Sequence, residues 1–152
     1  MSKIDFEYDV IVVGAGHAGC EAALAAARMG AETLLITINI FTVAQMSCNP
    51  AIGGLAKGHL VQEMDVMGGE MGVIADDSGI QFRMLNRSKG PSVWSLRSQN
   101  DRIDYSIRMR EVLETTPNLS LRQHDIKELL IDDKRVVGVL TEIGSKIFGR
   151  SV

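Results

Sequence analysis

The feature that most constrains the fold is a glycine-rich turn, GAGHAG, at residues 14–19. It follows the apolar, β-branched run YDVIVV (8–13) and precedes CEAALAAARM (20–29), which is a strong helix former. A G-x-G-x-x-G pattern between a strand and a helix predicts a dinucleotide-binding site. Gly14 permits the tight turn, Gly16 lets backbone amides approach a pyrophosphate, and Gly19 lets the helix pack against the strand.

The three residues between these glycines are Ala15, His17 and Ala18. We expect them to act mainly through their backbone N–H groups, because the first amides and the dipole of a helix favour an anion at its N-terminus. The His17 ring can also hydrogen-bond a pyrophosphate or fix the loop. The alternative is a glycine turn that binds no ligand.

The rest of the chain reads as one α/β domain. Gly30 is expected to end the first helix, and residues 33–37 (TLLIT) form the next strand, which completes a βαβ unit. Ile103, Ile107 and Leu113 fall at helical spacing in a later segment. The remaining expected elements are helices over 55–67 and 101–115, a mostly irregular stretch over 72–91, and strands over 119–124, 126–131, 135–141 and from 146 onward. These last strands predict a small antiparallel meander.

Composition excludes several classes of protein. The chain has 152 residues, of which 45% are hydrophobic and 23% charged, and its net charge is −3, so it is neither disordered nor globally basic. No apolar run reaches the roughly 18 residues of a membrane span, and the acidic N-terminus is not a secretory signal. Cys20 and Cys48 are expected to be free thiols in a reducing cytoplasm. His59 and His124 lack partners at metal-ligand spacing, so no metal site is expected.

The end of the second strand bears on which dinucleotide binds. NAD sites usually place Asp or Glu there to hold the ribose, but this strand ends LITIN, without an acid. The Thr37 hydroxyl or the Asn39 amide would take over that contact. The missing acid disfavours an ordinary NAD dehydrogenase. By analogy, the helix, strand and meander that follow indicate an α/β, Rossmann-type FAD-binding domain with a parallel sheet, over residues 1–152.

A basic stretch lies between Arg83 and Arg110, with seven basic residues and two acidic ones. Its net charge of +5 in a chain of −3 suits a phosphate backbone, and Trp94 offers a stacking face. The alternatives are a solvated basic surface or a contribution to the cofactor pocket. The candidate nucleic-acid residues are Arg87, Lys89 and Arg97.

Four segments together resemble the N-terminal part of the GidA/MnmG family: GAGHAGCEAALAAARMGAETLLIT, MSCNPAIGGLAKGHLVQEMDVMGGEMG, GIQFRMLNRSKGPSV and DRIDY. The resemblance runs from about Tyr8 to the end of the chain. It implies an FAD-dependent enzyme that forms 5-carboxymethylaminomethyl on the wobble uridine of tRNA. It also implies NADH as reductant, methylenetetrahydrofolate as one-carbon donor, glycine or ammonia as acceptor, a GTPase partner of the MnmE type, and a homodimer.

Members of this family are several times longer than 152 residues. The chain is therefore expected to be an N-terminal fragment that is C-terminally incomplete. It would lack the strand that returns to the parent sheet, and it would be inactive alone.

The resemblance also gives a role to the second glycine-rich stretch, CNPAIGG at 48–54. In such FAD enzymes this loop lies toward the flavin, so Asn49, Gly53 and Gly54 are expected near the ring. Lys57 would offset negative charge on reduced flavin or on phosphate. The alternative is a glycine-rich packing corner.

Two further assignments concern single residues. Cys48 is the candidate catalytic residue, because a thiol at a helix start can act as a nucleophile. The alternative is that Cys48 has a packing role and no chemical role. Cys20 is expected to be structural. Ile126 aligns with the family position whose backbone meets the adenine.

Two other functions stay open. One is a folate- and FAD-dependent tRNA uridine methyltransferase, which shares the fold. The other is a non-catalytic RNA-binding module that uses the basic stretch and binds no flavin.

Overall fold

The strand, glycine turn and helix fold as predicted in the computed structural model, which describes residues 5–152. β1 (Tyr8–Val13) and β2 (Thr33–Thr37) pair in parallel, and α1 (His17–Arg28) connects them. All five residues of β2 are buried, as expected for an apolar run covered on both faces. Gly30 has a φ of +91° directly after the helix, which confirms that it ends α1.

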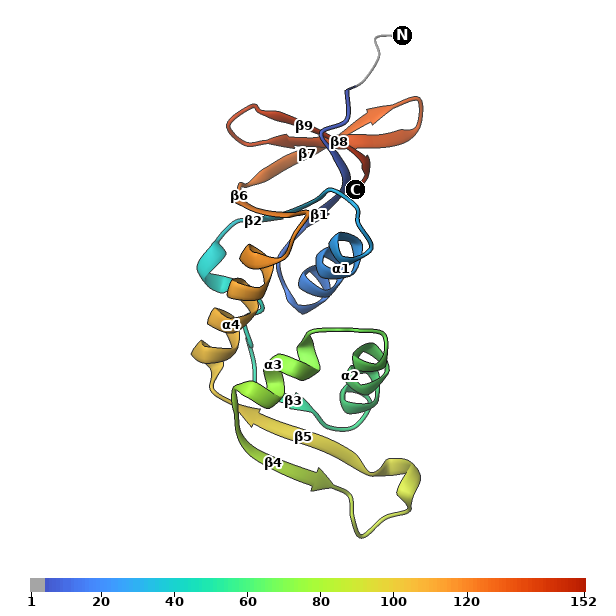
Figure 1. The fold of residues 1–152 in the computed structure, drawn as a ribbon, viewed down its shortest axis with the longest axis vertical. Coiled ribbons are helices and arrows are strands. Elements are labelled where there is room, and N and C mark those ends of the chain that lie inside the picture. Colours follow the sequence, from blue (N-terminus) through green and yellow to red (C-terminus); the bar gives the residue numbers. More distant parts are fainter. Residues whose placement is uncertain (1–4) are drawn as a thin grey trace.

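The large sheet has six strands in the order β6-β2-β1-β9-β8-β7 (Figure 1). Its other strands are β6 (Leu119–Gln123), β7 (Ile126–Asp132), β8 (Arg135–Thr141) and β9 (Lys146–Ser151). β6 adds to β2 in parallel, and β7, β8 and β9 form the predicted antiparallel meander. β9 also pairs in parallel with β1, with Tyr8 opposite Gly149. The expectation of a missing return strand was therefore wrong, because the last meander strand is itself that strand.

A second, antiparallel sheet was not anticipated from the sequence. Its strands, in the order β3-β5-β4, are β3 (Ala51–Gly53), β5 (Ser95–Asn100) and β4 (Gly79–Leu85). The stretch 72–91, expected to be mostly irregular, instead contains most of α3 (Met71–Asp77) and all of β4. The interior residues of β4 are all exposed, so no apolar alternation marks it as a strand, and its pairing with β5 defines it.

The two longer predicted helices are confirmed with small differences. α2 (Lys57–Val66) begins two residues later than expected, after Ala56 with its φ of 62°. α4 (Arg102–Thr115) is capped by Asp101, whose carboxylate accepts hydrogen bonds from the Ile103 and Asp104 amides at 2.8 and 3.0 Å. Short 3₁₀ turns span Ile40–Thr42 and Pro91–Val93.

The buried face of α4 differs from the one that the isoleucine spacing suggests. Tyr105, Met109 and Leu113 are fully buried, at intervals of four residues. Ile103 and Ile107 are 71% and 56% exposed, because they lie on the opposite side of the helix. The buried stripe places the Tyr105 ring against the first turn of α1.

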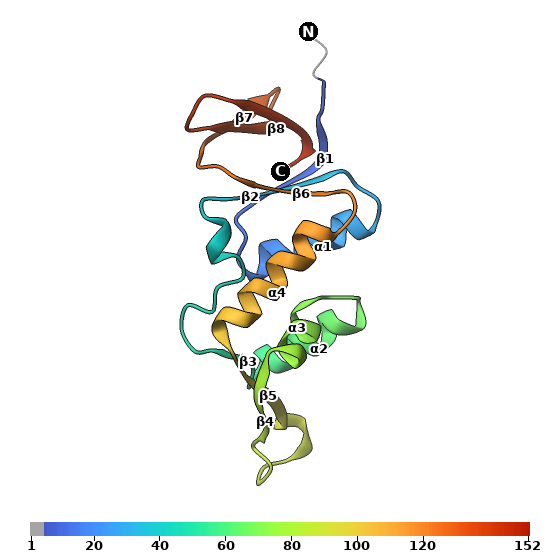
Figure 2. The same ribbon diagram turned by 60° about the vertical axis from the view of Figure 1, so that its left-hand side comes forward.

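The second sheet and its helices are attached to the large sheet through α1. Glu21 on α1 accepts hydrogen bonds from the backbone amides of Glu70 (3.0 Å) and Met71 (2.6 Å) at the start of α3. Arg28 donates to the Gly68 carbonyl at 2.8 Å and pairs with Glu70. α1 and α4 therefore lie between the two sheets, and the β4–β5 hairpin projects at the end of the molecule opposite the meander (Figures 1 and 2).

Gly19→Ala tests the packing of α1 against the glycine turn. A Cβ at Gly19 would lie 1.8 Å from the Gly14 carbonyl oxygen, so the helix or the turn must move. We expect the free energy of unfolding, measured by urea denaturation, to fall by roughly 3 kcal/mol. Gly16→Ala is the matched control, because a Cβ there meets no atom within 4 Å and should cost less than about 1 kcal/mol. Equal losses in the two variants would contradict this packing.

Candidate functional site

The glycine turn lies at the carboxyl end of β1, where the sheet order changes direction, with β2 on one side and β9 on the other. Ligands of open α/β sheets bind at such switch points. Gly14 adopts a φ of +105°, and no side chain caps α1, so the first helix amides remain open to a ligand. The space beside Gly16 is empty to at least 4 Å from a hypothetical Cβ. The turn can therefore receive an anion directly on the helix N-terminus.

The other residues of the turn have distinct environments. Ala15 is buried, and its carbonyl accepts a hydrogen bond from the Ala44 amide at 2.8 Å. This hydrogen bond fixes the turn to the loop that contains Ala44. Ala18 is exposed. Cys20 is fully buried, its thiol donates to the Ala15 carbonyl at 3.5 Å, and burial raises the pKa of this thiol to about 12. Cys20 therefore has the buried, unreactive position expected of a structural cysteine.

His17 links the turn to α4. Its ring meets Tyr105 edge-on, with the ring centroids 5.6 Å apart, and its Nδ1 is buried without a hydrogen-bond partner among residues 5–152. Burial, and then the positive charge of Lys57, lower the pKa of His17 below its ordinary value. The imidazole is therefore neutral over a wider pH range than a free histidine.

One end of the turn opens into a cavity of about 450 Å³, here called the Cys48 cavity. The lining residues that bear on function are His17, Cys48, Asn49, Gly53, Lys57 and Arg97. Three of these carry basic side chains, and no Asp or Glu lines the cavity. Residues separated by 80 positions in the sequence thus meet at one site of positive potential.

The residues of the second glycine-rich stretch have different positions. Cys48 is exposed, and its carbonyl accepts a hydrogen bond from Arg102 at 3.0 Å. The sequence suggested that Cys48 stands at a helix start, but α2 begins only at Lys57, nine residues later. Lys57 donates to the Ala51 carbonyl at 3.3 Å, and burial lowers the pKa of its ammonium group. Gly54 does not line the cavity, and its amide donates to the Leu96 carbonyl at 2.8 Å.

A second cavity, of about 280 Å³, lies at the end of β2 and is called the Ile38 cavity. It is lined by Ile38, Gln123, His124, Asp125, Thr141, Glu142 and Ile143. Ile126, which begins β7, directly follows this lining. Asp125 and Glu142 are acids that the sequence analysis did not single out, because only the topology brings the β6–β7 link and the end of β8 beside β2.

Neither residue expected to replace the ribose acid is fully free. Thr37 is 7% exposed, and its hydroxyl interacts with the backbone of Asn39 at 3.4–3.5 Å. The Asn39 side-chain oxygen accepts from the Phe41 amide at 2.9 Å, which leaves only its NH₂ group for a ligand. Asp125 and Glu142 are the acids that line the Ile38 cavity.

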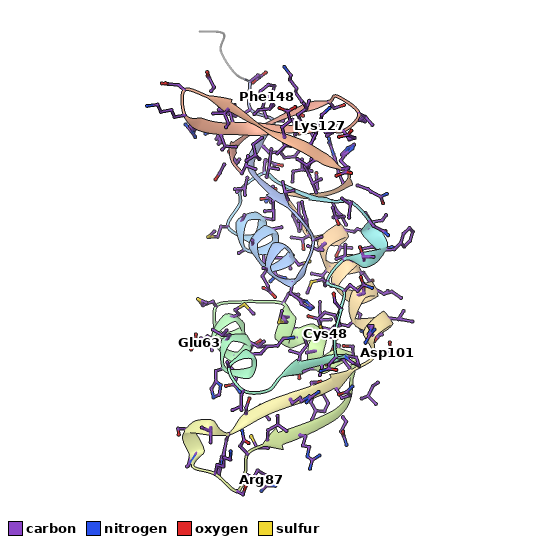
Figure 3. All side chains as sticks on the ribbon, turned by 180° about the vertical axis from the view of Figure 1, so that it is seen from behind. Cys48, Glu63, Arg87, Asp101, Lys127 and Phe148 are labelled. Atoms are coloured by element: carbon purple, nitrogen blue, oxygen red, sulfur yellow. The ribbon has the colours of Figure 1, made fainter. Side chains whose placement is uncertain are left out.

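The basic stretch does not form one patch. Arg87 and Lys89 lie in the exposed tip of the β4–β5 hairpin, and Figure 3 shows Arg87 at the far end of that hairpin from Cys48. The tip is held by the Trp94 indole, which donates to the Lys89 carbonyl at 3.0 Å. Arg97 instead lines the Cys48 cavity. The arginines of α4 are engaged: Arg108 pairs with Asp104 at 2.7 Å and Arg110 with Glu114 at 3.2 Å.

Two features are absent from residues 5–152. No group of three or more His, Cys, Asp and Glu side chains is arranged to hold a metal ion. Within the same residues, no helix is both long enough and apolar enough to cross a membrane.

The switch-point turn, the open helix N-terminus and the flanking cavities are features of Rossmann-type α/β domains, the fold class in which dinucleotide-binding sites are common. More particularly, the chain belongs to the GidA family, because residues 9–152 match the family described as glucose inhibited division protein A. It is 61% identical over 138 residues to the tRNA uridine 5-carboxymethylaminomethyl modification enzyme MnmG of Thermodesulfovibrio yellowstonii. That alignment covers 91% of this chain and 22% of the relative. The family resemblance seen in the sequence is thereby confirmed.

Solved structures agree with this assignment. GidA of Aquifex aeolicus superposes with a TM-score of 0.92 at 50% identity, over 95% of this chain and 24% of that chain. PqsL of Pseudomonas aeruginosa, a probable FAD-dependent monooxygenase, has a TM-score of 0.63 at 13% identity, over 93% of this chain and 40% of that chain, and shares the fold alone. The chain spans about a quarter of the length of its MnmG relatives.

The lowered pKa of His17 predicts a specific pH dependence of stability. The unfolded chain binds a proton at His17 near pH 6.5 and the folded chain only at lower pH, so the free energy of unfolding falls as the pH drops below 6.5. Urea denaturation at pH 7.5 and 5.5 measures this loss, and His17→Gln should reduce it. The exposed His59 supplies the control for the loss of one histidine, through the same substitution, His59→Gln. An identical pH dependence in wild type and His17→Gln would contradict the assignment.

Proposed function

We propose that this chain is the FAD-binding part of a flavoenzyme that forms 5-carboxymethylaminomethyl on the wobble uridine of tRNA. The observation that carries the proposal is the open N-terminus of α1 at the switch point, with one cavity on either side of it. An extended dinucleotide would lie with its charged centre on the helix N-terminus. The names of the MnmG relatives supply the reaction.

The residues present fit FAD in an extended position, from the Ile38 cavity over the glycine turn to the Cys48 cavity. The pyrophosphate would lie over residues 14–19, where the space beside Gly16 is empty and the helix amides are open. The adenosine would enter the Ile38 cavity, where Asp125 and Glu142 offer partners for ribose hydroxyls. β7 is an edge strand of the sheet, so one side of its backbone pairs with no other strand within residues 5–152, and the Ile126 backbone would bond the adenine there.

The flavin would enter the Cys48 cavity, where it would supply the redox chemistry. Gly53 and Asn49 would approach the ring, and Lys57 would lie close enough to offset a negative charge on it. Cys48 presents an exposed thiol to the same cavity and is the candidate nucleophile. The role of this chain in the reaction is to bind and orient the cofactor.

The remaining assignments rest on family membership. They are NADH as reductant, methylenetetrahydrofolate as one-carbon donor, glycine or ammonia as acceptor, a GTPase partner of the MnmE type, a homodimer and a cytoplasmic location. We place the tRNA contact at the hairpin tip, where Arg87 and Lys89 are exposed. A folate- and FAD-dependent tRNA methyltransferase and a flavin-free RNA-binding module remain the alternatives, which assays of the modified base and of FAD binding distinguish.

Gly16→Ala tests the cofactor site. We expect the wild-type chain to bind FAD saturably and not to bind NAD. Flavin fluorescence measures the binding of FAD, and calorimetry measures both. The added methyl group would fill the empty space over the α1 amides, so FAD should bind at least about tenfold more weakly, which is a loss of roughly 1.4 kcal/mol. Tight NAD binding without FAD binding would contradict the proposal. Unchanged FAD affinity in the variant would place the pyrophosphate elsewhere.

A double variant of the hairpin tip, Arg87→Ala with Lys89→Ala, tests the tRNA contact. Each lost phosphate contact should reduce the slope of log K against log salt by about 1, so tRNA binding should weaken and depend less on salt. The matched control is Lys127→Ala with Lys146→Ala, in the meander at the opposite end of the molecule (Figure 3). Equal effects of the two double variants on the slope would show that charge alone, and not the hairpin, binds the tRNA.

A further inference from the structure

Arg97 is a half-buried guanidinium group without an acidic partner among residues 5–152. It lies in the middle of β5, directly opposite Arg83 on β4. Two like charges at facing positions of an antiparallel pair repel each other. Arg97 therefore has five N–H donors and forms no ion pair within the described residues, while the carboxylates of Asp65 and Asp76 line a neighbouring cavity that Arg97 also borders.

The side chains around Arg97 in the Cys48 cavity also favour the binding of an anion. The other ionisable groups that line the Cys48 cavity are His17, Cys48 and Lys57, and no carboxylate lines it. Burial lowers the pKa of both His17 and Lys57, in agreement with a cavity poor in negative charge. An oxyanion that entered the cavity would meet only cationic or neutral side chains.

The wall that carries Arg97 is held in place by tight backbone packing. Gly53 on β3 faces Arg97 with a φ of +104°, and a Cβ there would lie 2.1 Å from the Leu96 carbonyl oxygen. This close approach brings the loop that bears Cys48 beside β5. The Gly54 carbonyl accepts a hydrogen bond from the Ser95 hydroxyl, which closes the same corner. Arg97 and the thiol thus share one preformed cavity.

We propose that Arg97 binds the carboxylate of the small amino acid that becomes the carboxymethylamino group of the modified uridine. This inference rests on the proposed function, because the group named for the MnmG relatives ends in a carboxylate attached through one carbon to nitrogen. That carboxylate is unchanged in the product, so a single binding group can hold it throughout the reaction. An arginine fork matches a carboxylate with two parallel hydrogen bonds, whereas a lysine offers only a point charge.

The exposed thiol of Cys48 provides a reporter for this site. Iodoacetate and iodoacetamide alkylate thiols alike, but only iodoacetate carries a carboxylate. We expect the rate ratio of iodoacetate to iodoacetamide at Cys48 to exceed that of N-acetylcysteine by about tenfold, because a nearby guanidinium attracts the anion. Mass spectrometry separates Cys48 from Cys20, which is buried.

Variants assign the effect to Arg97. Arg97→Gln should lower the ratio to within about twofold of N-acetylcysteine, and Arg97→Lys should keep part of it, since a charge without the fork remains. Arg87→Gln, at the hairpin tip, should keep the full ratio. Circular dichroism establishes that each variant is folded. An unchanged ratio in folded Arg97→Gln would overturn the proposal.

Competitors define the ligand. Excess glycine should slow the reaction with iodoacetate but not with iodoacetamide, and methylamine, which lacks the carboxylate, should slow neither. Inorganic phosphate is the competing ligand. If it protects Cys48 to the same extent as glycine, the assignment is overturned, because the cavity would then hold a phosphate of RNA or of a cofactor. FAD binding is measured separately on the same variants. In the wild type, normal FAD binding with an alkylation ratio no higher than that of N-acetylcysteine would overturn this inference alone, whereas absent FAD binding in the wild type would overturn the proposed function.

Discussion

The close packing of α1 on the glycine turn is the constraint on which the rest of the structure depends. Gly19 has no side chain, so the helix begins directly over the Gly14 carbonyl, and its first amides point away from the sheet. The same helix carries Glu21 and Arg28, which hold the start of α3. The second sheet and the Cys48 cavity are therefore held beside the glycine turn by α1, whose position is set by a glycine, together with α4, whose Arg102 donates to the Cys48 carbonyl.

Elements with strong local signals could be predicted from the sequence. β1, α1 and β2 follow from an apolar run, a glycine turn and an alanine-rich helix, and the meander follows from alternating strands with tight turns. β3 and β4 could not be predicted, because one has three residues and the other exposes its interior residues. Their pairing with β5 depends on contacts between distant segments. The return of β9 to β1 is likewise a property of the assembled sheet.

The candidate site was predictable to the same degree. The spacing of residues 14–19 predicts an anion site, and the family resemblance predicts that Cys48 lies beside the flavin; both stay predictions. Charge counting failed for the basic stretch, since Arg87 and Arg97 belong to one hairpin but lie at separate sites. Asp125 and Glu142 carried no local signal, because only the fold brings them to the end of β2.

The central claim is that one FAD molecule extends from the Ile38 cavity across the glycine turn into the Cys48 cavity. The most direct test is amide NMR of the ¹⁵N-labelled chain during titration with FAD. The account predicts that the amides of residues 14–19 shift together with those of Asp125 and Asn49, at the two ends of the line. Shifts confined to the hairpin tip, or a titration in which residues 14–19 do not move, would contradict it.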